Sequence, residues 1–148
     1  MKLTSRSEYA LLALVYLARS NATGYVSAET IAEAQKIPAK FLEQILLALR
    51  HGGLLTSKRG VGGGYALRVE ASRITVGEVI RIMDGPVALV PCAGGGGRAK
   101  CTCPDPRTCP LRLFMTGVRQ GLDSALDGCT LEELARLGDD PGGLAFEI

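Results

Sequence analysis

The sequence is poor in three things: histidine, net charge and long apolar runs. It has a single histidine, His51, and a formal net charge of only +2. No Ser-His-Asp set, no paired acid and base and no nucleotide-binding fingerprint is present, so the sequence does not favour an enzyme. The apolar run from Ala10 to Ala18 is far shorter than the roughly 20 residues of a membrane span. A charge this small does not by itself indicate a nucleic-acid-binding protein.

The start of the chain resembles a secretory signal only superficially. Lys2 and Arg6 precede the apolar run, but Glu8 lies just before it and Arg19 closes it without a small-x-small cleavage site. The sequence therefore predicts a cytoplasmic protein that does not enter a membrane, with reduced thiols.

The distribution of charge is more informative than its sum. Residues 1–70 hold nine basic and five acidic side chains, a net +4, so the remaining residues carry −2 of the total of +2. A front half that faces a polyanion is one explanation. The 148 residues, 47% of them apolar, suffice for one compact domain, or for a small domain with an added dimerisation element.

Three helices are predicted in the front half. Apolar residues at helical spacing predict a helix over 5–19, Ser27 is a suitable N-cap for a short second helix, and Pro38 is expected as the first residue of a third that ends at Arg50 or His51. Its apolar face predicts the buried residues Phe41, Leu42, Ile45, Leu46 and Leu49, and its opposite face carries Ala39, Lys40, Glu43, Gln44, Leu47 and Arg50.

A β-hairpin is predicted after the third helix. Two short runs, 54–57 and 65–68, are joined by a basic, glycine-rich stretch. Three helices followed by such a hairpin describe a winged helix-turn-helix, a mainly α fold with a small β-hairpin. Its third helix enters the major groove of DNA, and its hairpin reaches along the backbone or into a minor groove.

The back half adds a helix over 76–83 and a long helix over 110–127. The long helix has an apolar stripe, which either packs against a second copy of the chain or folds back onto the chain's own core. The expected organisation is a winged helix-turn-helix domain over 1–84, a cysteine-rich cluster-binding loop over 85–109, a long dimerisation helix with a short following helix over 110–137, and a flexible tail over 138–148.

Four stretches of the sequence resemble the Rrf2 family of bacterial winged-helix transcription regulators. They are MKLTSRSEYALLALVYLA, IPAKFLEQILLALRHGGLLTSKRGVGGGYAL, TVGEVIRIMDG and CTLEELA, and the resemblance extends from Met1 to about Leu137. It implies that Lys40, Glu43 and Gln44 read base edges and that Arg59 enters a minor groove of a pseudo-palindromic operator. These side chains suit those contacts. Lys40 replaces a small polar residue of some members.

Four cysteines lie in the loop that precedes the long helix: Cys92, Cys101, Cys103 and Cys109. Thiolates are soft ligands for iron–sulfur clusters and zinc, and a loop rich in glycine and proline lets them converge. A metal centre, a disulfide pair and a redox switch are all compatible with this pattern. Paired cysteines of zinc sites usually have two to four residues between them. Here one residue separates Cys101 from Cys103 and five separate Cys103 from Cys109. Cys129 stands apart and is expected to be a buried apolar residue.

The family resemblance implies an iron–sulfur cluster in this loop. Cluster-binding members use three cysteines that match Cys92, Cys103 and Cys109, and the fourth ligand is then either Cys101 or Glu8 of a partner subunit. Arg112 stands where some members have a histidine ligand. Four cysteines permit either cluster type; [4Fe–4S] is favoured over [2Fe–2S], and zinc is the alternative.

The predicted function is a homodimeric DNA-binding transcriptional regulator, a repressor, whose operator affinity depends on a cluster that senses iron, redox state or nitric oxide. One alternative is a cluster-free winged-helix regulator that senses a thiol/disulfide change or a small molecule. Another is an iron–sulfur electron-transfer protein, which would leave Lys40, Gln44 and Arg59 without a role and would bind no DNA in a salt-sensitive way.

Overall fold

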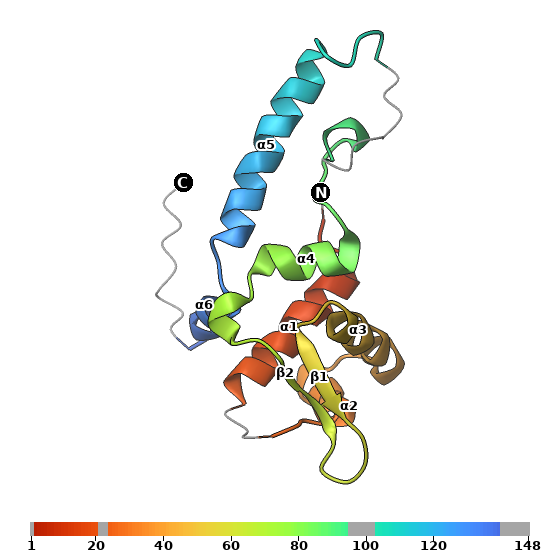
Figure 1. Cartoon of the computed structure of the whole chain (residues 1–148), viewed down its shortest axis with the longest axis vertical. Helices are drawn as coiled ribbons and strands as arrows, with labels where there is room; N and C mark the ends of the chain where they lie inside the picture. The colour runs from red at the N-terminus through yellow and green to blue at the C-terminus, as the bar shows by residue number, and fades with distance from the viewer. Residues whose placement is uncertain (1, 21–23, 95–102, 140–148) are drawn as a thin grey trace.

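The computed structural model describes residues 2–20, 24–94 and 103–139. This part contains six α-helices, one two-stranded hairpin and two single 3₁₀ turns (Figure 1). The elements are α1 (Ser5–Arg19), α2 (Ala28–Gln35), α3 (Ala39–His51), β1 (Leu55–Lys58), β2 (Gly64–Leu67), η1 (Ala71–Arg73), α4 (Val76–Asp84), η2 (Pro91–Ala93), α5 (Pro110–Asp127) and α6 (Leu131–Leu137). The predicted winged helix-turn-helix fold is confirmed.

Hydroxyl side chains begin four of these helices. Thr4, Ser27, Thr75 and Thr130 each accept a hydrogen bond from a backbone N–H in the first turn of α1, α2, α4 and α6. The expectation that Pro38 is the first residue of α3 is wrong by one residue. Its backbone is extended, with ψ at 124°, and it stands before Ala39 as the N-cap residue.

The core lies where α1, α2, α3, α4 and α6 meet. Fully buried side chains from all five helices fill it, together with one from β1 and one from the segment before α4. They are Leu14, Ile31, Leu42, Ile45, Leu46, Leu49, Val79 and Leu131 of the helices, Leu55 of β1 and Ile74. Phe41, predicted to be buried, is only half-buried. Its ring meets Tyr9 edge-on at the rim of the core, with ring centroids 5.7 Å apart.

The hairpin is antiparallel and is anchored to the connection between α1 and α2. Its register pairs Leu55 with Leu67 and Lys58 with Gly64, one residue away from the predicted ends of the strands. Tyr65 N–H donates to the Val26 carbonyl at 2.7 Å, and Val26 N–H donates back to Tyr65 at 2.9 Å. Gly64 makes this bridge possible, because a side chain there would collide with the backbone of Val26.

The end of α3 lies directly against α4. A Cβ atom added at Gly52, which follows His51, would come within 2.8 Å of Ile82 Cδ1 in α4. The end of α3 is therefore in side-chain contact with α4.

α5 extends away from the bundle as an arm, and its far end lies next to η2 (Figure 1). No residue of α5 is buried, and Phe114 is 67% exposed. The sequence left open whether the apolar stripe of α5 packs against a second copy or folds back onto the chain's own core. The exposure of α5 contradicts the second alternative. Instead an ionic cluster holds the base of the arm to α4: Arg81 contacts Asp127 at 2.5 Å and Asp123 at 3.7 Å.

α6 closes the bundle against α1. The guanidinium of Arg19 donates to the Ala135 carbonyl through Nε at 2.9 Å and through Nη2 at 2.6 Å. Leu131 N–H donates to the Ile74 carbonyl at 2.7 Å, which ties the start of α6 to the segment before α4. Within the ranges that the structure describes, no helix has the length and apolar character needed to cross a membrane.

Candidate functional site: a nucleic-acid interface and a cysteine loop

The predicted base-reading residues share one exposed face of α3. Lys40, Glu43 and Gln44 are all exposed, and helical geometry places side chains three and four residues apart on the same side. None of them makes a side-chain hydrogen bond or ion pair with the described part of the chain, so their polar groups are available to an outside partner. Together they present donors and acceptors of the kinds that major-groove base edges pair with.

The wing carries two exposed basic side chains. Arg59 is exposed in the tip between β1 and β2, next to the exposed Lys58. Arg50 in α3 donates from Nη1 to Ser57 Oγ at 2.8 Å, a bond that holds β1 against the recognition helix. The wing and α3 are therefore positioned as one unit.

Three of the four loop cysteines lie in the described residues, and two of them are in contact. Cys92 lies in η2, Cys109 is the N-cap residue of α5, and Cys103 Sγ lies 3.3 Å from Cys109 Sγ. All three are half-buried. Cys101 lies outside the described residues. The α5 N-terminus therefore holds two thiols side by side, close enough to bind one metal centre together or to form a disulfide bond.

The position of Cys109 at a helix N-terminus favours its thiolate. The pKa of Cys109 is lowered chiefly by a hydrogen bond from the backbone N–H of Arg112, and next by the hydrogen bond with Cys103. The backbone N–H of Leu111 and the positive charge of Arg112 lower it further. The thiolate is the form that binds metals and attacks electrophiles.

Arg112 ties the cysteine-bearing segments to α5. Its Nε donates to the Cys92 carbonyl at 3.3 Å and its Nη1 donates to the Pro106 carbonyl at 2.8 Å. η2, the 103–109 segment and the first turn of α5 are thus joined by one side chain. Their soft sulfur donors fit an iron–sulfur cluster or zinc.

Glu8 is not part of this group within one chain. It is exposed on the first turn of α1, and no three His, Cys, Asp or Glu residues of the described segments come together as a metal site. The same finding applies to Cys92, so among the described loop cysteines the structure brings together Cys103 and Cys109 alone. Cys129, expected to be buried, is half-buried, and burial raises the pKa of its thiol.

A clasp that the sequence did not reveal lies at the root of the cysteine loop. Asp84, the last residue of α4, accepts from Ser7 Oγ at 2.6 Å and from Thr4 Oγ1 at 2.6 Å, one bond on each carboxylate oxygen. Ser7 is fully buried. The clasp fixes the N-terminus of α1 to the point where the loop leaves α4. Ser7 and Asp84 are 77 positions apart, a distance over which no sequence pattern connects them.

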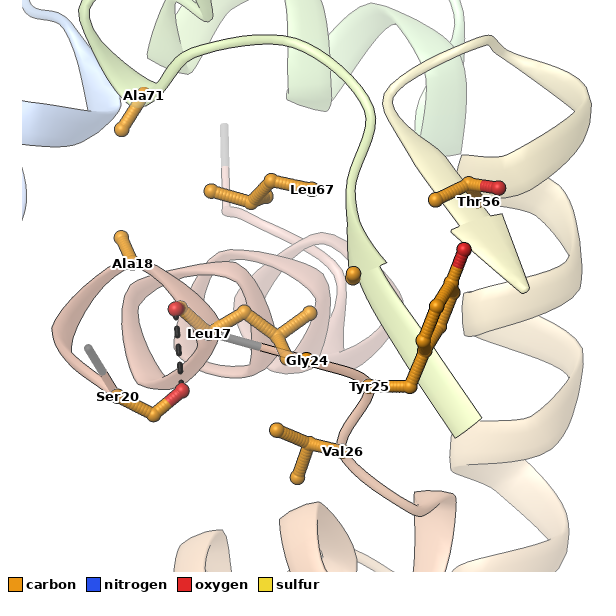
Figure 2. Close-up of a pocket in the computed structure, with 10 residues that line it drawn as sticks. Leu17, Ala18, Ser20, Gly24, Tyr25, Val26, Thr56, Leu67 and Ala71 are labelled. Atoms are coloured by element: carbon orange, nitrogen blue, oxygen red, sulfur yellow. Dashed lines mark hydrogen bonds between the residues drawn. The ribbon is translucent and has the colours of Figure 1, made fainter. Parts of the chain in front are cut away.

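A cavity of about 510 Å³ opens under the hairpin but contains none of these residues. Figure 2 shows its lining of small and aliphatic side chains from α1, the segment before α2 and the hairpin, with hydroxyl groups from Ser20, Tyr25 and Thr56. The Ser20 hydroxyl is used locally, since it donates to the Leu17 carbonyl at 3.1 Å. Among the described residues that line the cavity, none is charged or a usual metal ligand.

Comparison with known proteins agrees with the winged-helix fold. The model of the Rrf2 family, described as an iron-dependent transcriptional regulator, matches residues 3–137. The HTH-type transcriptional regulator IscR of Klebsiella pneumoniae strain 342 is 39% identical over 134 residues, which are 90% of this chain and 79% of that protein.

Solved structures of similar proteins show the same architecture. CymR, the global cysteine regulator of B. subtilis, matches with a TM-score of 0.74 and 31% identity over 91% of this chain and 96% of that one. IscR of T. potens matches with a TM-score of 0.72 and 27% identity over 98% of this chain and 93% of that one.

The chain belongs to the Rrf2 family. It is a DNA-binding transcriptional regulator of the IscR type and not an enzyme.

Proposed function

We propose that the chain is a homodimeric repressor whose operator affinity is set by an iron–sulfur cluster bound in the cysteine loop. The observation that carries this proposal is the contact between Cys103 and Cys109 at the start of α5. It places two metal-binding sulfurs on the same helix whose apolar face is uncovered. Sensing and dimerisation would then share one element.

The uncovered face of α5 supports the dimer. Phe114 and Val118 are exposed on it, and Gly117 and Gly121 lie on the same side with open space above them. Two such arms can pack closely, each covering the apolar side chains of the other. The dimer would present two α3 helices to two half-sites about one turn of DNA apart, which is the arrangement a pseudo-palindromic operator requires.

Cys92, Cys103 and Cys109 would hold the cluster, with Cys101 or the Glu8 of a second copy as the fourth ligand. The set of ligands favours [4Fe–4S] over [2Fe–2S], because up to four thiolates come from one loop. When bound, the cluster would supply sensitivity to oxidants, nitric oxide or loss of iron. Zinc in the same site would supply structure without this sensitivity.

The chain's own residues would carry the loop's state to the DNA. Arg112 joins the loop to α5, and Arg81 joins the base of α5 to α4. α4 in turn touches the end of α3 at Gly52. A change in the angle of α5 would alter the spacing of the two recognition helices. A misfit at both half-sites would then cost binding energy comparable to mismatched base pairs, about 1–3 kcal/mol each.

Purification of the full chain without oxygen tests the cluster. We expect a coloured protein with a visible absorption band and with iron and sulfide in stoichiometric amounts. Cys109→Ser should lose the colour, and Cys129→Ser, outside the loop, should keep it. A colourless protein with one zinc per chain would refute the cluster.

Operator binding tests the DNA-reading role. Arg59→Ala should lower the affinity at least about tenfold and leave the dimer intact, because it removes a minor-groove contact. Arg73→Ala is the matched control, since Arg73 is an exposed arginine on η1, away from the wing. Affinity should also fall steeply with salt. Equal affinities for the two variants would contradict the role of the wing.

A cluster-free thiol switch is the second candidate. The 3.3 Å contact between the Cys103 and Cys109 sulfurs favours it. A peroxide would oxidise one thiol to a sulfenic acid with release of water, and the second thiol would displace a further water as the disulfide forms. This candidate predicts a colourless protein whose operator affinity changes with peroxide and is restored by a dithiol reductant.

A further inference from the structure

We propose that Leu47 is a specificity-determining residue that contacts the C5-methyl group of a thymine in each half-site. The inference rests on the proposed function, because it requires α3 to enter the major groove. It goes beyond the polar readers Lys40, Glu43 and Gln44 by assigning a base preference to an apolar side chain.

Leu47 lies in the middle of the reading face of α3. A helix turns by about 100° per residue, so Lys40, Gln44, Leu47 and His51 fall within an arc of about 60°. Glu43 flanks this arc on one side. A helix that places Lys40, Glu43 and Gln44 toward base edges therefore places Leu47 one turn further along the same groove.

The neighbours of Leu47 on the exposed face of α3 are polar. It is 42% exposed, and it is the large hydrophobic residue that α3 leaves exposed. The residues one turn before and after it, Glu43, Gln44, Arg50 and His51, are all exposed and polar. The neighbouring Leu46 and Leu49 point into the core and are fully buried. If this face of α3 lies in the major groove, the Leu47 side chain is best matched by an apolar group of the DNA.

Only one such group exists on the base edges of the major groove. Guanine, cytosine and adenine present donors and acceptors there, and thymine alone adds a methyl group. Leu47 placed against a donor or an acceptor would bury that polar group without a partner. Against a thymine methyl it removes two apolar surfaces from water. Burial of one methyl group changes affinity by about fourfold.

The test begins by selecting binding sequences from a random duplex library with the full-length protein, in whichever of its loaded and stripped forms binds DNA. The best duplex is then synthesised again with each half-site thymine replaced in turn by deoxyuridine, which removes only the methyl group. We expect about a fourfold loss of affinity at one thymine per half-site. Replacing that thymine's pair with a pair that has 5-methylcytosine at the same position should restore part of the loss relative to unmodified cytosine.

The variant Leu47→Ala completes the test as a double-mutant cycle. It should bind the thymine and deoxyuridine duplexes equally well, with an unchanged thermal unfolding midpoint. Leu12→Ala is the matched control, because Leu12 is an exposed leucine on α1, 39% exposed and outside the reading face. That variant should keep the fourfold difference of the wild type.

Three outcomes would overturn the inference and leave the proposed function standing: selection of a site without an enriched thymine, equal wild-type affinity for all the deoxyuridine duplexes, or a full deoxyuridine penalty in Leu47→Ala. If selection enriches no sequence at all and binding is insensitive to salt, the proposed function itself fails. The two failures are therefore distinguishable.

Discussion

The helical bundle buries its apolar side chains, whereas the α5 arm leaves its apolar side chains exposed or half-exposed. In α3, Leu42, Ile45, Leu46 and Leu49 are fully buried, whereas no residue of α5 is buried. Each of the two helices contains four leucines and one phenylalanine, so the difference lies in what is available to cover them. The bundle completes its core within one chain. The arm presents an apolar face that a second copy would cover in the proposed dimer.

The largest effect should come from a cavity in the bundle. Leu46→Ala should lower the free energy of unfolding by about 2–5 kcal/mol, since Leu46 is fully buried. The adjacent Leu47→Ala should change it by no more than about 0.5 kcal/mol, because Leu47 is exposed. Urea unfolding of both variants measures the contrast. Similar losses in the two would mean that α3 does not sit on the core as described.

The clasp between α1 and α4 should give the next largest effect. Ser7→Ala removes one hydrogen bond to the exposed carboxylate of Asp84 and should destabilise the protein by about 0.5–1.5 kcal/mol. Ser5→Ala, at an exposed position two residues earlier, is the control and should be close to neutral. Thermal unfolding compares them. If both variants melt like the wild type, the clasp does not hold the root of the loop.

A charge placed on the apolar face of α5 should weaken dimer association without unfolding the chain. Phe114→Glu should raise the dimer dissociation constant at least about tenfold, because it places a charge in the proposed contact between two arms. Gln120→Glu adds the same charge on the opposite side of α5 and should leave association unchanged. Analytical ultracentrifugation gives the constants, and circular dichroism shows whether the bundle is intact. Equal association of the two variants would argue for another dimer surface.

The smallest effect concerns pH and the start of α6. Backbone and side-chain hydrogen bonds from Thr130 lower the pKa of Glu133. A lowered carboxyl pKa means that its contribution to stability is present above the ordinary value of 4.5 and is lost as pH falls through the folded-state pKa. The difference in unfolding temperature between wild type and Glu133→Gln should therefore be present at pH 7 and shrink in acid. A difference that grows in acid would contradict this sign.

The helices and hairpin were predictable because their signals are local. Thr75 and Thr130 precede the helices that they cap, and the glycine-rich tip separates two short strands. The exposure of Lys40, Glu43 and Gln44 followed from helical periodicity alone. Phe41 shows the limit of that method, since periodicity places it on the inner face but not at the rim, where Tyr9 covers only part of it.

The remaining features depend on contacts between distant parts of the chain. Arg19 reaches the Ala135 carbonyl across 116 positions, and Ser7 reaches Asp84 across 77. Such pairs arise only when the helices have packed. The fate of the α5 stripe was likewise open, because an apolar face looks the same in sequence whether its cover is the same chain or a copy. The ligand set of the loop stays a prediction, with Cys101 outside the described residues.

The contact between Gly52, at the end of α3, and Ile82 of α4 bears on how a regulator and its operator sequence diverge together in evolution. Because the end of α3 contacts α4 here, we expect a motion of α5 to move α3 as a rigid body and not to reorient its side chains one by one. We expect base preference to be tuned by residues 40–47 and half-site spacing by the junction of α4 with α5. The two properties can then diverge independently among relatives.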